Sequence, residues 1–451
     1  MQRKRVFVKI GVVSYPASGH LNPMTALARR LQSRGHEVLC IGVPDTEPAI
    51  RAAGLTFISY CEEEFPVGSL AEIYAPVAKM HGLEVVNYTC RMIFSRLGRA
   101  ALKHLPQKLE EAGVEALVID PIHFFLELVP MSMGIPYIHI WCALHFDFSG
   151  STPAPLFNWQ HETTSEALTR NVGGLQQIGE ALLPVLAEAM PYADRTGLRI
   201  NWQEPGSTVS KLAVITQAPK EFDFPGIPWP AHFHYAGPFH DDEGREPVAF
   251  PREQLSGKPL IYASLGTLVN GLDHVYKAIL EATTELPEFQ LVLSVGQCIN
   301  PDELRPIPSN AIIVRKAPQL ELLKGAALCI THAGLNTALE ALTQGVPMVA
   351  LPIGYDQPGV AARIVYHGVG ESLEIEKLTG EQLLEAMRKV LENQSYRERA
   401  RHFQKVIAET RGLEVAADRI EQAFKRANPS IDQNRRGIRY LGRGVQASGA
   451  P

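Results

Sequence analysis

Two histidines, His20 and His332, each stand after a short apolar run and beside a helical pattern. Such runs are typical of buried parallel strands, and ligands bind at the carboxyl edge of a parallel sheet. Asp120 ends another apolar run, residues 116–120, so parallel pairing would bring it to the same edge as His20. An imidazole beside a carboxylate is a suitable general base near neutral pH, because the carboxylate favours the imidazolium that forms.

Taken alone, neither residue demands this interpretation. A histidine after a strand is often structural, and Asp120, which precedes Pro121, could act as a helix N-cap or turn former. The pair favours a catalytic role, in which His20 removes a proton and Asp120 orients the ring.

Residues 317–357 carry a denser set of candidate ligand-binding residues. The runs 326–330 and 348–351 predict strands around a helix over 335–344, which makes a βαβ unit. The free N–H groups and the dipole of a helix's first turn attract phosphate. The residues there that can donate a hydrogen bond or let a backbone approach are His332, Gly334, Asn336 and Thr337.

Carboxylates and amides near this unit suit sugar hydroxyls. Glu340 lies one turn beyond Asn336 on the same helical face, where it could accept hydrogen bonds from a ribose. Asp356 and Gln357 follow the second strand and suit the vicinal hydroxyls of a sugar.

These residues resemble the donor-binding signature of the family 1 UDP-glycosyltransferases, in the bacterial form with the histidine thirteen residues after Gln319. The resemblance implies a role for each position. It assigns the uridine edge to Gln319, the diphosphate to His332, Asn336 and Thr337, and the ribose to Glu340. It assigns the hexose to Asp356 and Gln357, and the catalytic base to His20 with Asp120. Ser264 and Thr267 resemble the family's second phosphate contact, with a small-residue turn as the alternative.

One position departs from the family pattern. Where the family usually has a tryptophan that stacks on uracil, this chain has Lys316. A lysine can lay its methylene stem on a base but offers no π-face.

The resemblance implies an α/β protein of the GT-B fold, with two Rossmann-like, doubly wound parallel-sheet domains facing across a cleft. The expected boundaries are an acceptor-binding domain over 1–239, a linker over 240–258, a donor-binding domain over 259–427 and a disordered tail over 428–451. We expect the last helix to pack back on the first domain. The sequence also predicts helices over 24–33, 166–190 and 395–426, and the first domain's last strand over 211–216.

Composition excludes several classes of protein. The length of 451 residues suits two domains, and the 45% hydrophobic content is typical of a soluble globular protein. The net charge of −5 gives no sign of a basic surface for nucleic acid. Six cysteines without a CxxC pair indicate buried free thiols in a reducing compartment. We find no signal peptide and no spanning segment, and expect a cytoplasmic protein that can also sit peripherally at the inner face of the cytoplasmic membrane.

Within the family, residues 142–144, 221–225, 263–268 and 356–368 most resemble those of bacterial zeaxanthin glucosyltransferases and macrolide-type members. The resemblance implies an inverting transfer of a hexose, by preference glucose, from a UDP-sugar to a hydroxyl of a lipophilic molecule such as a carotenoid, macrolide, phenol or sterol. No DxD-type acidic cluster asks for a metal, so we expect neither an essential metal nor another cofactor. The alternatives are a non-catalytic nucleotide-sugar binder and a UDP-sugar epimerase of similar architecture.

Overall fold

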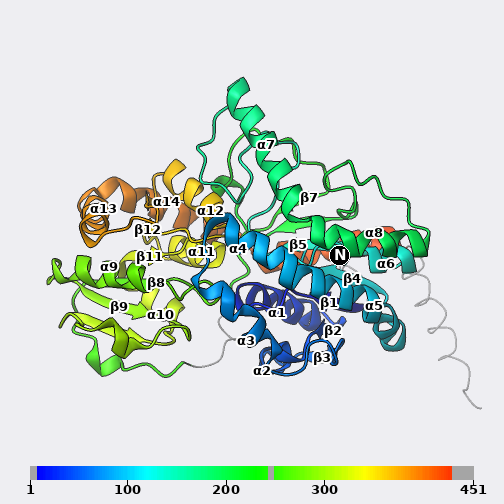
Figure 1. The fold of residues 1–451 in the computed structure, drawn as a ribbon, viewed down its shortest axis with the longest axis horizontal. Coiled ribbons are helices and arrows are strands. Elements are labelled where there is room, and N and C mark those ends of the chain that lie inside the picture. The colour runs from blue at the N-terminus through cyan, green and yellow to red at the C-terminus, as the bar shows by residue number, and fades with distance from the viewer. Residues whose placement is uncertain (1–7, 242–247, 429–451) are drawn as a thin grey trace, which may run out of the picture.

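The computed structural model describes residues 8–241 and 248–428. They form two parallel sheets covered by helices, which confirms the expected fold class. We call the seven-stranded sheet with helices α1–α8 and α15 the first lobe, and the six-stranded sheet with α9–α14 the second lobe. Figure 1 shows the first lobe on the right and the second on the left, with α7 projecting from the body.

All strand pairs in the two sheets are parallel. The first sheet runs in the order β3 (Thr56–Ser59), β2 (Glu37–Gly42), β1 (Lys9–Val13), β4 (Ala116–Ile119), β5 (Tyr137–Trp141), β6 (Val214–Thr216) and β7 (Phe233–Tyr235). The second runs in the order β10 (Ala311–Val314), β9 (Gln290–Ser294), β8 (Leu260–Ser264), β11 (Ala326–Thr331), β12 (Met348–Ala350) and β13 (Gly370–Ser372).

Side chains alternate between the two faces of each strand, so each sheet contributes to two cores. In β1, Val12 packs with residues of α1 and α15, whereas Val13 packs in the core that also holds α5. The helices of the first lobe are α1 (Ser18–Ser33), α2 (Glu47–Ala52), α3 (Ser69–Tyr74), α4 (Gly82–Thr89), α5 (Ser95–Ala112), α6 (Leu128–Met133), α7 (Ser165–Ala181), α8 (Leu183–Thr196) and α15 (Gly412–Ala427).

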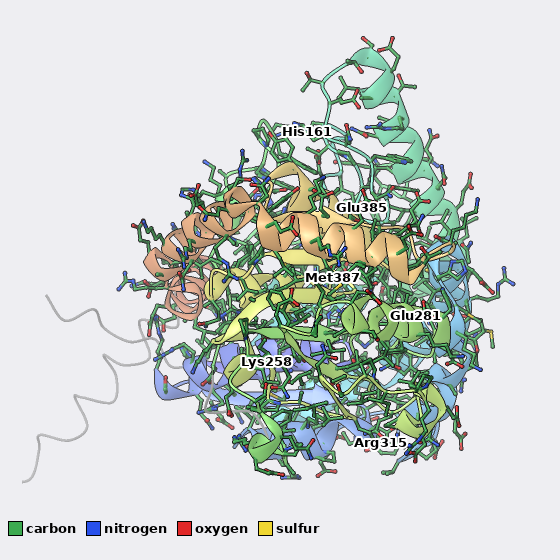
Figure 2. The ribbon with its side chains drawn as sticks, turned by 90° about the vertical axis from the view of Figure 1, so that its left-hand side faces the viewer. His161, Lys258, Glu281, Arg315, Glu385 and Met387 are labelled. Atoms are coloured by element: carbon green, nitrogen blue, oxygen red, sulfur yellow. The ribbon has the colours of Figure 1, made fainter. Side chains whose placement is uncertain are left out.

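The second lobe is covered in the same way. Figure 2 looks onto its outer side, where α13, marked by Glu385 and Met387, lies against α9, marked by Glu281. Met387 is fully buried between the helix and the sheet. The helices here are α9 (Asp273–Thr284), α10 (Gln319–Leu323), α11 (Leu335–Thr343), α12 (Gln357–Tyr366), α13 (Gly380–Glu392) and α14 (Gln394–Glu409).

The chain ends on the first lobe. α15 packs along α1, where Arg34 pairs with Glu414, Asp418 and Glu421 of α15. Apolar residues of α15, such as Ile420, complete the core under β1. The last described helix therefore fastens the second half of the chain to the first sheet.

Several predicted boundaries are wrong. The helix expected over 24–33 begins at Ser18. The single helix expected over 166–190 is two, α7 and α8, because Pro184 lies in a helix's first turn and cannot continue the preceding one. The helix expected over 395–426 is also two, α14 and α15.

The strand expected over 211–216 is β6, but it is not the last of its sheet, because the three-residue β7 pairs beside it. Residues 242–247 of the predicted linker and 429–451 of the predicted tail lie outside the described residues. Five of the six cysteines are buried as expected, whereas Cys298 is exposed. Over residues 8–241 and 248–428, no helix has the length and apolar character needed to cross a bilayer.

Candidate active site

His20 and Asp120 meet at the carboxyl edge of the first sheet. Asp120 directly follows β4 and is fully buried, and its Oδ2 lies 2.7 Å from His20 Nδ1. The other contacts of this carboxylate are backbone N–H groups, from Tyr15 at 3.3 Å and Ile122 at 3.1 Å. Since the carboxylate accepts, His20 donates from Nδ1 and keeps Nε2 for taking a proton.

The surroundings of His20 increase its basicity. Burial lowers the pKa of its imidazole, but the Asp120 carboxylate, its hydrogen bond and the more distant Asp356 carboxylate together raise that pKa above its usual value. The ring of Tyr15 stands edge-on to the imidazole at 5.2 Å. This arrangement suits a general base that is oriented from behind and charged transiently.

His20 lies in the first turn of α1, where the sequence suggested a loop. Pro23 has no backbone N–H, so the carbonyl of Gly19, four residues earlier, lacks its usual partner within the helix. Instead it accepts a hydrogen bond from Asn336 Nδ2 of the second lobe. A proline that looked like a loop residue thus helps to join the two lobes beside His20.

His332 stands between β11 and α11, pressed against two glycines. A Cβ at Gly266, whose φ is +78°, would lie 2.5 Å from His332 Nε2, and one at Gly334 would lie 2.6 Å from it. Burial lowers the pKa of His332 to about 4, so the ring is neutral near pH 7. Its buried Nδ1 has no hydrogen-bond partner among the described residues, which leaves a polar atom suited to a ligand.

The other predicted phosphate ligands lie in the first turn of α11. Asn336 Oδ1 accepts from Gln217 Nε2 at 2.7 Å, and Thr337 Oγ1 accepts from Gln319 Nε2 at 3.2 Å. Gln217 also donates to the Cys142 carbonyl. It was missed in the sequence, although it follows β6 directly, at the same edge as Asp120.

Gln319 and Glu340, predicted to hold the uridine and the ribose, are hydrogen-bonded to each other. Gln319 Nε2 donates to Glu340 Oε2, and Gln319 Oε1 accepts from the Tyr262 hydroxyl at 2.9 Å. Glu340 is only 2% exposed. The second lobe thus holds these two side chains in fixed positions.

Ser264 and Thr267 lie where β8 ends. Ser264 Oγ accepts from the N–H of Gly266 at 3.3 Å, so it shapes the turn, which was the alternative role considered for it. The hydroxyl of Thr267 lies 2.9 Å from that of Ser18, at the start of α1. Thr267 therefore faces the first lobe, as Asn336 does.

Asp356 and Gln357 open α12. Asp356 Oδ2 accepts from the Leu144 N–H of the first lobe at 2.8 Å. Burial raises the pKa of Asp356, opposed by that hydrogen bond and by His20. Gln357 Oε1 accepts from the N–H groups of Ile353 and Gly354, which leaves its Nε2 as the polar group for a ligand.

One cavity of about 1070 Å³ joins these residues. Asp120 is the one predicted site residue that does not line it, because it lies behind His20. Those that do are His20, Ser264, Thr267, Gln319, His332, Gly334, Asn336, Thr337, Glu340, Asp356 and Gln357. Among the described residues, no group of three or more His, Cys, Asp or Glu side chains is arranged to hold a metal ion.

The chain is similar to known glycosyltransferases. Residues 223–410 match the family model described as UDP-glucoronosyl and UDP-glucosyl transferase. The chain is 30% identical to a zeaxanthin glucosyltransferase of Pantoea ananas, over 93% of this chain and 96% of the relative. It is 27% identical to the NDP-glycosyltransferase YjiC of Bacillus subtilis, over 93% and 98%.

Solved structures share the fold. The crystal structure of CalG4, the calicheamicin glycosyltransferase, superimposes with a TM-score of 0.70 at 22% identity, over 94% of this chain and 100% of that one. The spinosyn rhamnosyltransferase SpnG complexed with thymidine diphosphate gives 0.64 at 19% identity, over 92% and 100%.

Two facing parallel-sheet lobes with a shared cavity define the GT-B fold of glycosyltransferases. Within that class, the chain belongs to the UDP-glucoronosyl and UDP-glucosyl transferase family. It is an enzyme that transfers sugar from a nucleotide-diphosphate donor to small-molecule acceptors. This membership sets aside the two alternatives, a non-catalytic binder and an epimerase.

Proposed function

We propose that the enzyme transfers glucose from UDP-glucose to a hydroxyl of a lipophilic small molecule, with inversion at the anomeric carbon. One observation carries the proposal: His20, which is hydrogen-bonded to Asp120, borders the same cavity as the predicted phosphate and sugar residues of the second lobe. A base and a donor site that share one space permit direct transfer between two bound substrates.

In the proposed reaction His20 Nε2 removes the proton from the acceptor hydroxyl. The acceptor oxygen then forms a bond to the anomeric carbon, while the bond from that carbon to the diphosphate oxygen breaks. Asp120 stabilises the imidazolium that results. The oxygen attacks from the face opposite the diphosphate, which inverts the configuration.

The first turn of α11 is the proposed site for the leaving diphosphate. Its free N–H groups and dipole favour negative charge, and the unpartnered Nδ1 of His332 supplies a further polar atom. Asn336 and Thr337 line the same part of the cavity, as do Ser264 and Thr267 across the loop. The geometry is that of a helix N-terminus prepared for an anion.

The uridine and the ribose are assigned to Gln319 and Glu340, whose mutual hydrogen bond places an amide and a carboxylate side by side. Lys316 lines the cavity beside them and is assigned to the base through its methylene stem. Glucose is assigned to Asp356 and Gln357, which open α12 at the same cavity.

The acceptor part of the cavity is apolar. Ala181, together with aromatic and aliphatic residues of the first lobe, lines it around His20, and this supports a lipophilic alcohol over a charged one. The additional residues are Val86, Phe94, Ile122, Phe124, Phe146, Leu156 and Ile178. The similarity to a zeaxanthin glucosyltransferase supports a carotenoid-like alcohol first, with macrolides, phenols and sterols as further candidates.

The domain boundaries stay as proposed from the sequence, with acceptor binding over 1–239, a linker over 240–258, donor binding over 259–427 and a tail over 428–451. A cytoplasmic location belongs to the same proposal and is supported by the six free cysteines. Contact with the inner face of the cytoplasmic membrane would give access to a lipid acceptor.

The first experiment incubates the purified protein with UDP-sugars and a panel of apolar alcohols, and measures UDP release and the glycoside by mass spectrometry. We expect UDP-glucose with a lipophilic alcohol to give the highest turnover, and NMR of the product to show the inverted anomer. A retained configuration, or transfer to polar acceptors only, would contradict the proposal.

The second experiment tests the base. We expect His20→Ala to reduce kcat about 100- to 10,000-fold and to leave the Kd for UDP within about twofold, because general base catalysis is lost and the donor site is not touched. His402→Ala, which changes an exposed histidine of α14, is the matched control. Full turnover in His20→Ala would overturn the assignment.

A further inference from the structure

Asp223 is the centre of a buried polar network outside the cavity. It follows the short helical turn Lys220–Phe222, and its side chain is 1% exposed. Five hydrogen bonds converge on this one carboxylate. Oδ1 accepts from Arg363 Nη2 at 2.6 Å, Arg363 Nε at 3.1 Å and Phe224 N at 2.9 Å, and Oδ2 accepts from His145 Nε2 at 2.7 Å and the Tyr235 hydroxyl at 2.5 Å.

The charges of this network are matched inside the protein. Burial alone would raise the pKa of Asp223, but the Arg363 guanidinium and the His145 imidazole hold it well below its usual range. The guanidinium of Arg363 also lies 4.2 Å from the centre of the Phe224 ring and donates to the Gly359 carbonyl. A carboxylate with every acceptor position filled is a rigid anchor.

The network ties together two segments that meet at the active site. Arg363 lies on α12, the helix that begins directly after Asp356. His145 is the neighbour of Leu144, whose N–H donates to the Asp356 carboxylate. Asp223 thus anchors both segments that form the hydrogen bond between Leu144 and Asp356. Its Oδ1 binds Arg363 on the helix of Asp356, and its Oδ2 binds His145, the neighbour of Leu144.

A second contact joins α12 of the second lobe to the first lobe, at the boundary between the two lobes that we call the seam. The Gly359 N–H of α12 donates to the Pro155 carbonyl of the first lobe at 2.8 Å. A Cβ at Gly359 would lie 2.7 Å from that carbonyl oxygen, so the two backbones are in direct contact. The start of α12 therefore has a fixed place against the first lobe.

We propose that Asp223 is a positioning residue that sets the proposed sugar-binding carboxylate of Asp356 opposite His20. This inference rests on the proposed function. It goes beyond that function because it gives Asp223, which touches neither substrate, the role of aligning Asp356 of the second lobe with His20 of the first. The charged groups that act on His20 are Asp120, behind it, and Asp356, across the cavity.

The test compares Asp223→Asn and Arg363→Lys with the wild type. Either change leaves α12 and the loop at Leu144 without their shared anchor, so Asp356 is displaced from His20. We expect kcat to fall about 100-fold, because a misplacement of about 1 Å has an effect of this size. The Kd for UDP should stay within about twofold, since its predicted ligands lie on α10, on α11 and where β8 and β11 end, and none of them lies on α12. Arg363→Lys keeps the positive charge but loses the paired hydrogen bonds of the guanidinium to Asp223. It provides the test if Asp223→Asn does not fold.

A second readout needs no substrate. Asp356 raises the pKa of His20, so its displacement should lower that pKa in an NMR titration, with the resonance assigned by its absence in His20→Ala. The matched control is Arg34→Gln, which also breaks a charged link between distant segments but acts at the far end of α1. It should leave the His20 pKa and kcat unchanged.

The outcomes separate this inference from the proposed function. If the wild type transfers no sugar but the His20 pKa falls in Asp223→Asn, the positioning role holds and the assigned function fails. If the wild type is active and Asp223→Asn matches Arg34→Gln in both kcat and the His20 pKa, the positioning role is wrong. The positioning role is also contradicted if Asp223→Asn and Arg34→Gln lose the same amount of stability and show no other change.

Discussion

At the scale of single residues, the proposed base, His20, depends on a carboxylate that the cavity does not reach. Asp120 is fully buried and hydrogen-bonded to His20, so in the proposed mechanism it acts on the acceptor only through His20. In the proposed mechanism the active form of His20 is the neutral one, so activity should be lost as the pH falls through the raised pKa of its imidazole. The acid limb of the pH profile therefore reports the contact between the two side chains.

This contact gives a prediction with a definite sign. Asp120→Asn keeps a hydrogen-bond acceptor near Nδ1 but removes the charge, so the pKa of His20 falls and the acid limb of kcat/KM moves to lower pH. We expect kcat to decrease about 100-fold or more, because the imidazolium loses its stabilising partner. The measurement is the rate of UDP release across the pH range.

Glu37→Gln is the matched control for Asp120→Asn. It removes a carboxylate from the amino end of β2, the opposite edge of the same sheet. Its acid limb should coincide with that of the wild type. A profile for Asp120→Asn that also coincides would show that Asp120 has no part in the base.

At this scale the sequence predicted that His20 and Asp120 lie together, and the two side chains are hydrogen-bonded. His20 and Asp120 could be paired from the sequence alone, because each follows an apolar run, and parallel strands bring such ends to one edge. Asp223 could not be found in this way. Its partners, His145, Tyr235 and Arg363, are separated from it by 78, 12 and 140 residues, and no local pattern relates them.

At the scale of elements, α7 contributes to the wall of the proposed acceptor site. It projects from the body of the first lobe (Figure 1), and Ile178 and Ala181 near its carboxyl end line the cavity. The break before α8 places Leu182 there as well. A side chain enlarged at this end of the helix would take space from the acceptor and none from the donor.

We therefore predict that Ala181→Trp excludes bulky acceptors. The kcat/KM for a long or polycyclic alcohol should fall about 10- to 100-fold, which is the expected effect of overfilling a packed site, and a short alcohol should be little affected. The KM for the UDP-sugar should not change. Gly173→Ala, on the same helix where an added Cβ meets nothing within 4 Å, is the control.

A selectivity that stays the same in Ala181→Trp would place the acceptor elsewhere in the cavity.

The elements themselves were predicted unevenly from the sequence. The βαβ unit around His332 has long apolar runs and a glycine loop, and its predicted strands and helix match β11, α11 and β12 within a residue or so. The start of α1 was missed because Pro23 suggested a loop, although its missing N–H is what frees the Gly19 carbonyl for Asn336.

At the scale of the whole molecule, the two lobes share contacts and a core. Buried residues of both sheets, such as Ile119 and Ile330, belong to one connected apolar cluster. Backbone hydrogen bonds also cross the seam, from Gly82 to Ile353 and from Gly271 to Ala78. The sequence predicted two facing domains, but the extent of this shared core depends on side chains that meet only after folding.

The shared core predicts that the lobes unfold together, and the tryptophans allow a direct test. All four, Trp141, Trp159, Trp202 and Trp229, lie in the part of the chain that forms the first sheet, whereas the predicted UDP ligands on α10 and α11 lie in the second lobe. UDP at 100 times its Kd should stabilise the folded state by about 2.7 kcal/mol. Tryptophan fluorescence and far-UV circular dichroism should then show the same rise in Tm, because binding in one lobe stabilises both. A rise in the circular dichroism transition with no change in the fluorescence transition would mean that the lobes unfold independently despite their common cluster.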